Sequence, residues 1–525
     1  MPKVLISDKM SPLAAQIFKD KNIEVDVKTG LSPNELAEII GDYDGLAIRS
    51  STKVTSEILA QAKKLKVIAR AGIGVDNIDQ NAATDHGVIV MNTPFGNSIT
   101  TAEHAIAMMF SLARQIPQAN SSTHAGKWEK SKFMGTELTS KNLGVIGCGN
   151  IGSIVIKRAV ALQMKVLGYD PYLTEARAAE LGIKKVSLDE LFTQADFITL
   201  HVPLIESTKN IINKETIAKM KDGVFIINCA RGGLVNEADL KIALDSGKVA
   251  GAALDVFAIE PATENILFNH DKLICTPHLG ASTNEAQENV AVQVAEQIAN
   301  YLNHNIIENS LNIPSVSPED AKALNPYLKL GEALGSFIGQ ISDDRIKKIK
   351  ISYQGKVTKL NTKPITALTL KSILTPFIEE VNIVNCHKIA AKKSILVEDI
   401  ISNERSDYST FLSIDIIGEH NHTHIAGTLF QDEARIVAVN QVKLEASLSP
   451  NLLFIKNEDK PGLIGELGKF LGDHNINIAN FHLGREPNKS GSAIALIAID
   501  QDISNANIAK IAEMNSVTEV KILKF

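Results

Sequence analysis

The stretch that decides the fold is LGVIGCGNIG, residues 143–152. An apolar run typical of a buried strand leads directly into Gly147, Gly149 and Gly152, and an amphipathic helix pattern follows. Glycines at this spacing allow a tight turn and a close backbone approach to a pyrophosphate at the helix N-terminus. The glycine pattern alone is weak evidence, and its alternative is a structural turn in another α/β domain. The strand before it and the helix after it favour a dinucleotide site.

The next strand, Lys165–Tyr169, ends at Asp170. A carboxylate at this place accepts hydrogen bonds from ribose hydroxyls and repels a 2′-phosphate. No arginine follows directly, so the sequence favours NAD over NADP as the cofactor.

Short apolar runs separated by helix-length stretches continue on both sides of this motif. Strands buried on both faces of a parallel sheet have this nearly continuous apolar character. One set predicts a doubly wound, Rossmann-type domain: Leu143–Ile146, Lys165–Tyr169, Phe197–His201, Val224–Asn228, Ala250–Leu254 and Leu273–Cys275. An earlier set predicts a second parallel, flavodoxin-like sheet: Lys3–Ser7, Gly45–Ile48, Val67–Ala69 and Val88–Val90.

Two long helices are predicted between and after these sheets. The first spans Ser98–Gln118, with Thr100 and Glu103 as a capping box. The second spans Ser282–Asn303 and is expected to return to the first sheet. A linker follows around Asn312–Asp320, and the last 75 residues read β-α-β-β-α-β, which predicts a ferredoxin-like module.

The expected architecture is therefore α/β, with an α+β segment and a ferredoxin-like module after it. The predicted divisions are 1–98 with 282–312 for a discontinuous substrate-binding domain, 99–281 for the NAD-binding domain, 313–450 for an intervening domain, and 451–525 for the terminal module. A chain of 525 residues is too long for a single core, which supports several domains.

Composition excludes several classes of protein. The net charge is −6 with no long basic run, so nucleic-acid binding has no support. No apolar stretch is long enough to cross a membrane, and no signal pattern opens the chain. The four cysteines lack the spacing of a zinc site or a disulfide framework, so no metal is expected and the reducing cytoplasm is the expected compartment.

Three residues that follow strand ends of the dinucleotide sheet form a candidate catalytic set: Arg231, Glu260 and His278. Oxidising a 2-hydroxy acid requires removal of the hydroxyl proton as hydride leaves C2. His278 is the predicted general base, because histidine titrates near neutral pH. Glu260 is expected to fix the imidazole tautomer, and Arg231 to hold the substrate carboxylate in a bidentate fork. Each residue alone is more often structural; the combination favours catalysis.

The chain resembles the D-isomer-specific 2-hydroxyacid dehydrogenases, and among them the long forms that carry an intervening domain and an ACT module. The resemblance rests on the 143–152 loop and on RAGIGVDN at 70–77, NTPFGNS at 92–98, FMGTEL at 133–138, NCARGG at 228–233, DVF at 255–257 with Glu260-Pro261, and TPHLGAS at 276–282. It covers most of residues 1–310. In the tail, the middle region matches by length and position more than by motifs, whereas the terminal module resembles ACT domains in KNEDKPG at 456–462 and in the NINI segment that contains Asn477.

The resemblance implies oxidation of 3-phosphoglycerate to 3-phosphohydroxypyruvate with NAD, the first step of serine synthesis. It also implies the same catalytic trio and a homotetramer. The residues it implies around NAD are Gly147, Gly149, Asn150, Ile151, Gly152, Asp170, Val202, Cys229, Ala230, Arg231, Asp255, His278, Leu279, Gly280 and Ala281. A valine at 202 replaces a hydroxyl residue, so a backbone contact is expected there.

A phosphorylated substrate needs cations. Arg49 and Arg70 follow strand ends of the first sheet and are the candidates, with solvated surface arginines as the alternative. Gly72 and Asn97 are expected near them. Lys130 and Lys132, in the loop that carries Trp128, are expected to contribute across a subunit interface.

The terminal module carries a candidate effector site for an amino acid, L-serine by resemblance. Asp459 is expected to hold the amino group, and Asn457 and Asn477 to donate hydrogen bonds. The alternative is a module that assembles copies without a ligand.

Two other functions remain open at this point. One is a glyoxylate or hydroxypyruvate reductase on the same scaffold, which the long tail and the paired arginines disfavour. The other is an NAD-sensing interaction protein, which can retain the same trio. A formate dehydrogenase is disfavoured because a compact apolar site would not hold extra cations.

Overall fold

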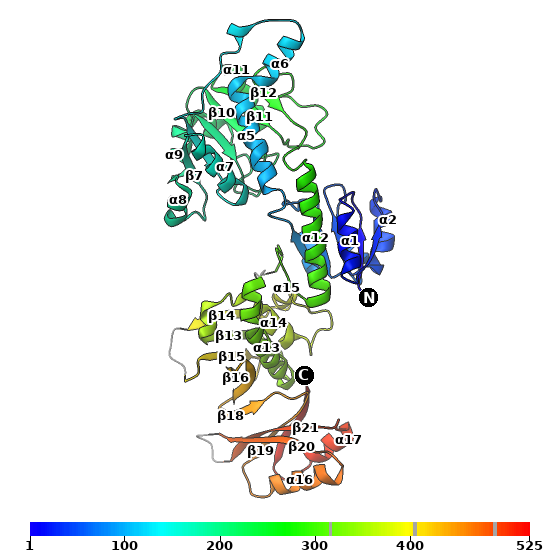
Figure 1. The fold of residues 1–525 in the computed structure, drawn as a ribbon. Coiled ribbons are helices and arrows are strands. Elements are labelled where there is room, and N and C mark those ends of the chain that lie inside the picture. The colour runs from blue at the N-terminus through cyan, green and yellow to red at the C-terminus, as the bar shows by residue number, and fades with distance from the viewer. Residues whose placement is uncertain (314–317, 403–406, 487–490) are drawn as a thin grey trace.

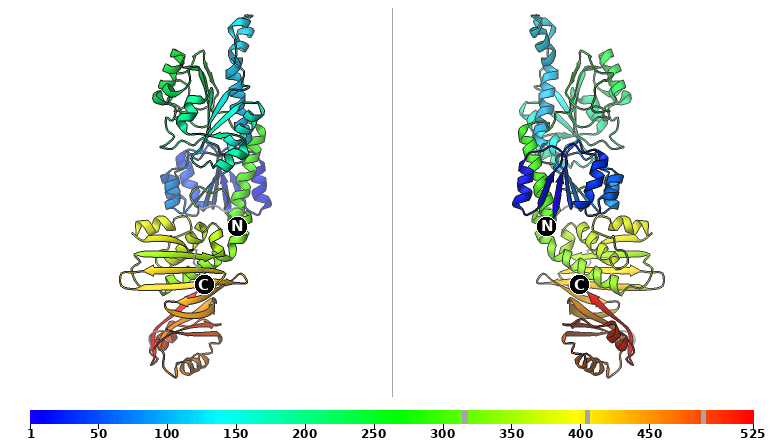
Figure 2. Two further views of the ribbon diagram at one scale, coloured as in Figure 1. Left: turned by 90° about the vertical axis from the view of Figure 1, so that its left-hand side faces the viewer. Right: turned by 90° about the vertical axis from the view of Figure 1, so that its right-hand side faces the viewer.

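A computed structural model describes residues 1–313, 318–402, 407–486 and 491–525. The molecule is elongated, with four bodies in a row (Figures 1 and 2). The body that carries the glycine loop lies at one end, and the terminal module lies at the other. The chain's first sheet and the intervening domain lie between them.

The first sheet is parallel and five-stranded, in the order β2-β1-β3-β4-β5. Alternate residues of its strands point to opposite faces, so Val4 and Ile6 pack against α1 and α12 while Leu5 packs against α2, α3 and α4. The elements are β1 (Lys3–Ile6), α1 (Leu13–Asp20), β2 (Glu24–Val27), α2 (Pro33–Ile39), β3 (Gly45–Ile48), α3 (Ser56–Gln61), β4 (Val67–Arg70), α4 (Gln80–Asp85), β5 (Ile89–Asn92) and α12 (Asn284–His304).

The second sheet is parallel and seven-stranded, in the order β12-β11-β10-β9-β6-β7-β8. One face is covered by α5, α7 and α8, and the other by α9, α10 and α11. The elements are α5 (Ser98–Arg114), α6 (Ile116–His124), β6 (Asn142–Ile146), α7 (Asn150–Ala161), β7 (Lys165–Tyr169), α8 (Glu175–Leu181), β8 (Lys184–Lys185), α9 (Leu188–Gln194), β9 (Phe197–Leu200), α10 (Lys214–Lys219), β10 (Val224–Asn228), α11 (Glu237–Ser246), β11 (Val249–Leu254) and β12 (Leu273–Cys275).

The intervening domain is a six-stranded mixed sheet, in the order β14-β13-β15-β16-β17-β18, packed against helices. Its elements are α13 (Pro318–Ile341), β13 (Lys348–Gly355), α14 (Lys363–Leu374), α15 (Cys386–Lys392), β14 (Leu396–Ser402), β15 (Thr410–Ile417), β16 (His422–Phe430), β17 (Glu433–Val439) and β18 (Val442–Ser447).

The terminal module has the predicted β-α-β-β-α-β order and the antiparallel sheet β20-β21-β19-β22. One face of this sheet packs on its own helices. The other face joins the intervening core, where Phe454 meets Phe337 of α13 at a ring separation of 6.0 Å. Its elements are β19 (Asn451–Glu458), α16 (Leu463–Asp473), β20 (Ile478–Arg485), β21 (Ser492–Ile499), α17 (Asn505–Ala512) and β22 (Val517–Lys524).

The two parallel sheets contain every strand that the sequence predicts for them, and each sheet has one further strand at an edge. The missed strand β2 reads Glu-Val-Asp-Val and is half exposed, and β8 is a pair of exposed lysines. Polar edge strands lack the apolar run that reveals buried ones.

The long helix predicted over Ser98–Gln118 is two helices. α5 ends where Gln115 adopts a left-handed φ of 52°, and α6 continues to His124. The predicted capping box is wrong: the N-cap is Asn97, while Glu103 pairs with Arg158 at 2.7 Å. The expected linker around 312–320 lies partly outside the described residues.

In the described part of the chain, no helix is long and apolar enough to cross a membrane. Within the same residues, no cluster of three or more metal-ligating side chains occurs. All four cysteines are free thiols.

Candidate active site

The glycine loop lies at the point where the seven-stranded sheet reverses its strand order. β6 has β7 on one side and β9 on the other, so the segments after β6 and β9 lead away in opposite directions. Open parallel sheets bind ligands at the carboxyl ends of strands at such a reversal. The loop 147–152 follows β6, and His201 and Val202 follow β9.

The three glycines have different physical roles. Gly147 has a φ of +95°, and a side chain there would strike the His201 carbonyl. A side chain at Gly152 would strike the Gly147 carbonyl oxygen. A Cβ on Gly149 would meet nothing within 4 Å, so this position faces open space. No side chain of the described residues caps α7, so its first amides face that space without a side-chain acceptor, which fits a pyrophosphate.

Asp170 orders this loop from the end of β7. One carboxylate oxygen accepts the Cys148 N–H at 2.9 Å, and the other accepts the Tyr172 N–H at 2.8 Å. Each oxygen keeps a lone pair for a ribose hydroxyl. The residues present therefore fit an adenosine ribose and pyrophosphate.

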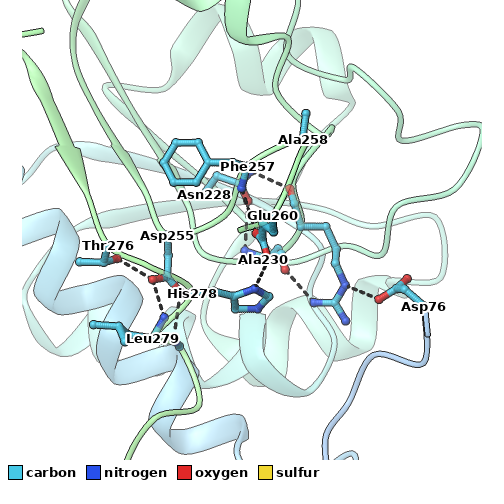
Figure 3. A network of polar contacts seen from close by, with 12 residues as sticks. Asp76, Asn228, Ala230, Asp255, Phe257, Ala258, Glu260, Thr276, His278 and Leu279 are labelled. Atoms are coloured by element: carbon cyan, nitrogen blue, oxygen red, sulfur yellow. Dashed lines mark hydrogen bonds and ion pairs between the residues drawn. The ribbon is translucent and has the colours of Figure 1, made fainter. Parts of the chain in front are cut away.

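Glu260 and His278 form a hydrogen-bonded pair that is open to solvent. The Nδ1 atom of His278 lies 2.7 Å from Oε2 of Glu260, and the side chains are 50% and 35% exposed. Figure 3 shows the two side chains pointing toward each other. The other Glu260 oxygen accepts the Phe257 N–H at 3.0 Å, which fixes the carboxylate. In the described residues, Nε2 of His278 has no partner, so it is free to exchange a proton with a substrate.

Asp255 holds the turn that presents His278. Its buried carboxylate accepts the Thr276 hydroxyl at 2.5 Å and the backbone N–H groups of Leu279 and Gly280 at 2.7 and 2.9 Å. Burial alone would raise the pKa of Asp255, but hydrogen bonds from His104 and Thr276 outweigh burial and lower it. Asp255 thus supports the turn that presents His278, and its predicted contact with NAD stays a prediction.

Arg231 reaches from the second sheet to the first. Its Nε donates to Asp76 at 3.1 Å, and Nη1 donates to the Ala230 carbonyl at 2.7 Å. A side chain at Gly74 would strike Nη2, so glycine there admits the guanidinium. Figure 3 shows that Asp76 comes from a separate segment. A carboxylate held in a fork through Nε and Nη2 would have to replace Asp76, whereas a fork through Nη1 and Nη2 would leave the Asp76 contact in place.

Arg70 lies beside Arg231 at the edge of the first sheet. Burial, and then the Arg231 charge, lower the pKa of Arg70 to about 10. Within the part of the chain that the structure describes, its Nε is buried without a partner, and the Asn97 side-chain oxygen is likewise unpaired. Gly72, with a φ of +154°, has only Arg70 near its Cβ direction, at 4.0 Å. Unpaired buried groups of this kind indicate a missing polar ligand.

Arg49 follows β3, and some of its hydrogen-bond donors are already engaged within the protein. Its guanidinium donates to the Lys9 carbonyl at 3.1 Å, and its backbone N–H donates to Asp8 at 2.6 Å. Asp8 also accepts from Thr52, so it closes the reversal between β1 and β3.

The remaining predicted site residues differ in burial and in their distance from the glycine loop. Cys229 is buried, and burial raises its pKa, whereas Asn150 at the start of α7 is exposed and Ile151 and Ala281 are half-buried. Lys130 and Lys132 form the exposed 3-10 turn after α6, which projects at the far end of the molecule in Figure 1. One chain therefore does not bring these lysines to the site.

The effector residues are not brought together within one chain either. Glu458 pairs with Ser492 at one end of β21, and Ile478 pairs with Ile499 at the other. Asn457 and Asn477 therefore lie at opposite ends of an eight-residue strand, roughly 23 Å apart at 3.3 Å per residue. Asp459 pairs with Arg485 at 3.0 Å.

Sequence reasoning missed the acidic partners, Asp8 and Asp76, and the supports of Asp255. Asp76 stands within a quoted motif, but only the fold reveals that it meets Arg231. His104 carried no signal, because its partner is 151 positions away in the chain.

Together the loop, the Glu260–His278 pair and Arg231 define an NAD-dependent dehydrogenase of 2-hydroxy acids. Comparison with known families agrees. Residues 106–280 match the D-isomer specific 2-hydroxyacid dehydrogenase NAD binding domain, residues 323–440 the D-3-phosphoglycerate dehydrogenase intervening domain, and residues 451–513 the ACT domain.

Relatives match the full chain. The D-3-phosphoglycerate dehydrogenase of Synechocystis sp. is 42% identical over 100% of this chain and 95% of its own length, and that of Archaeoglobus fulgidus is 41% identical over 95% of each. A D-lactate dehydrogenase structure from Aquifex aeolicus, complexed with NAD and lactic acid, is 30% identical with a TM-score of 0.54 and covers 60% of this chain and 100% of that one. The chain belongs to the D-3-phosphoglycerate dehydrogenase family, and its cofactor is NAD.

Proposed function

We propose that this chain oxidises 3-phospho-D-glycerate to 3-phosphohydroxypyruvate, the first step of L-serine biosynthesis. The observation that carries the proposal is the solvent-open Glu260–His278 pair, placed on the same edge as Arg231, with Arg70 beside Arg231 on the other sheet. Relatives of this name match over the whole chain, including the intervening and ACT regions.

NAD, when bound, accepts the hydride that leaves C2 of the substrate. His278 takes the hydroxyl proton on Nε2 while Glu260 stabilises the resulting imidazolium through Nδ1. Arg231 holds the substrate carboxylate, and Asp255 keeps the His278 turn in place. In the reverse direction, His278 returns the proton to the carbonyl oxygen.

The first sheet supplies the phosphate selectivity in this proposal. In the described residues, Arg70 has an unpaired buried Nε, and the Arg49 guanidinium donates a hydrogen bond to the Lys9 carbonyl alone. Gly72 and Asn97 line the same edge, the latter with an unpaired oxygen. Lys130 and Lys132 contribute only if a second copy brings its exposed turn to this edge.

Regulation and assembly follow from the terminal module. We propose that L-serine binds between two modules of a homotetramer, with Asn457 and Asp459 from one copy and Asn477 from the other, because one chain keeps them apart. Separate hydrophobic clusters in the two parallel-sheet bodies support the proposed division between the substrate-binding and NAD-binding domains. The four unpaired cysteines support a cytoplasmic location.

NADH-linked turnover of 3-phosphohydroxypyruvate, with hydroxypyruvate and glyoxylate as competing substrates, tests the proposal. A kcat/KM for the phosphorylated substrate that exceeds the others at least ~100-fold is expected from one charge-assisted phosphate site. Preference for hydroxypyruvate or glyoxylate would instead indicate a reductase on this scaffold. Addition of millimolar L-serine separates an effector site from a purely assembling module.

A further inference from the structure

A cavity of about 580 Å³ lies between the first body and the intervening domain. One wall is the connection between α3 and β4, with Lys63, Lys64 and Lys66, and the other is the segment Asn382–Val384 before α15. Figure 2 shows these two bodies in direct succession. The volume falls within the range of small-molecule sites.

The lysine wall carries uncompensated positive charge. Lys66 pairs with Asp44 at 3.0 Å, and among the described residues Asp44 is the one carboxylate that lines the cavity. Among the described residues, the side chains of Lys63 and Lys64 have no ion-pair or hydrogen-bond partner. His86 adds a further polar side chain to the rim. Converging ammonium groups raise the local concentration of anions.

The floor of the cavity is largely apolar and includes buried side chains. Leu65 and Val384 are buried, with exposures of 5% and 6%, and Tyr301 and Leu302 complete the lining. A basic rim over an apolar floor is the arrangement that holds a small organic anion, with lysine as a point-charge partner for phosphate.

The two walls are held together beside the cavity. Asn382 donates to the Gly87 carbonyl at 3.1 Å, and Lys388 and Lys392 both pair with Asp85 at 2.7 Å. These two hydrogen bonds lower the pKa of Asp85. A ligand in the cavity would touch both bodies and stabilise their docked arrangement.

We propose that this cavity is a binding site for a small phosphate-bearing anion, held by Lys63 and Lys64, that fastens the intervening domain to the substrate-binding body. The site lies at the amino ends of the strands, since Lys66 directly precedes β4, whereas Arg70 ends the same strand at the catalytic edge. The anion is therefore distinct from the substrate bound at the opposite edge and does not compete with it.

The test uses the full chain with inorganic phosphate as the probe, at constant ionic strength set with chloride. Calorimetry is carried out on Arg49→Gln protein, which weakens the substrate phosphate site, and hydrogen exchange locates the binding. One equivalent of phosphate is expected to bind and to slow exchange in 61–66 and 379–386. Adding Lys63→Gln and Lys64→Gln to this protein is expected to raise the Kd for phosphate about tenfold or more.

The matched control is Lys469→Gln with Lys510→Gln, which removes the same charge from two exposed lysines of the terminal module. The control is expected to bind phosphate unchanged. All four lysines are exposed, so the variants should keep the parental Tm. Phosphate binding that is equally weakened in both double variants, or that slows no exchange in 61–66 and 379–386, would overturn the proposal.

Discussion

Both sheets are parallel and each has a reversal of strand order, but the two reversals are used in opposite ways. In the seven-stranded sheet, the reversal between β6 and β9 is left open by Gly149. In the five-stranded sheet, the reversal between β1 and β3 is closed by Asp8, which accepts hydrogen bonds from Arg49 and Thr52. The strand order determines where a ligand can approach each sheet. The loop after β6 or β1, with Gly149 or Asp8, determines whether that place is open.

The two sheets are therefore suited to different ligands. The open reversal fits the cofactor, and the neighbouring strand ends carry Glu260 and His278. On the five-stranded sheet, the closed reversal fixes the backbone of Arg49, and the unpaired polar atoms gather at Arg70 and Asn97. The first sheet is thus suited to select a substrate rather than to hold a nucleotide.

The largest expected effect comes from the chemistry of the seven-stranded sheet. His278→Asn removes the group that exchanges the proton, so kcat should fall roughly 10²–10⁴-fold. Glu260→Gln keeps a hydrogen-bonding side chain but loses the charge, so its kcat should fall less. Steady-state kinetics in the reductive direction measure both. A Glu260→Gln enzyme that is slower than His278→Asn would contradict these roles.

The glycine loop offers a matched pair of substitutions. Gly149→Val places a side chain in open space, so the KM for NAD should rise about tenfold or more while Tm stays unchanged. Gly152→Val forces a side chain against the Gly147 carbonyl, so Tm should fall as well. Initial-rate kinetics and thermal unfolding separate the two. Equal losses of Tm would show that Gly149 is structural.

The closed reversal of the first sheet is tested by Asp8→Ala. This change leaves the Arg49 N–H and the Thr52 groups without their acceptor, which should cost about 1–3 kcal/mol of unfolding free energy. The KM for the phosphorylated substrate should rise, and the KM for NAD should not. Asp20→Ala, at an exposed helix end, is the control for urea unfolding. A rise in both KM values would mean that the sheets do not divide the ligands.

The effect that is smallest near neutral pH is a pH dependence of stability at the open reversal. Burial lowers the pKa of His201 to about 4, so the folded protein keeps this imidazole neutral while the unfolded chain protonates near pH 6.5. The unfolded state binds more protons in this window, so stability is lost as pH falls from about 6.5 to 4. Urea unfolding of wild type and His201→Gln should diverge there. Parallel pH profiles would contradict the assignment.

Most of the buried strands and the glycine turn can be predicted from the sequence. Buried strands and the Gly147–Gly152 turn leave local signals, and so do the β-α-β-β-α-β segments of the terminal module. The break at Gln115 and the edge strand β2 do not, because a left-handed residue and a half-exposed strand depend on the surrounding packing.

The candidate site was predictable by residue type but not by partner. His278 and Glu260 were expected together and lie 2.7 Å apart. The pairing of Arg231 with Asp76 and the distance between Asn457 and Asn477 were not foreseen, because both depend on how separate elements meet in space. Contacts between elements far apart in the chain leave no local pattern.

The most direct test of the division between the sheets is the ratio of kcat/KM for 3-phosphohydroxypyruvate over hydroxypyruvate, measured in wild type and in Arg49→Gln. If the first sheet selects the phosphate, this ratio falls about tenfold or more in Arg49→Gln while kcat/KM for hydroxypyruvate stays unchanged. Equal losses for the two substrates would contradict the assignment of phosphate selection to the first sheet.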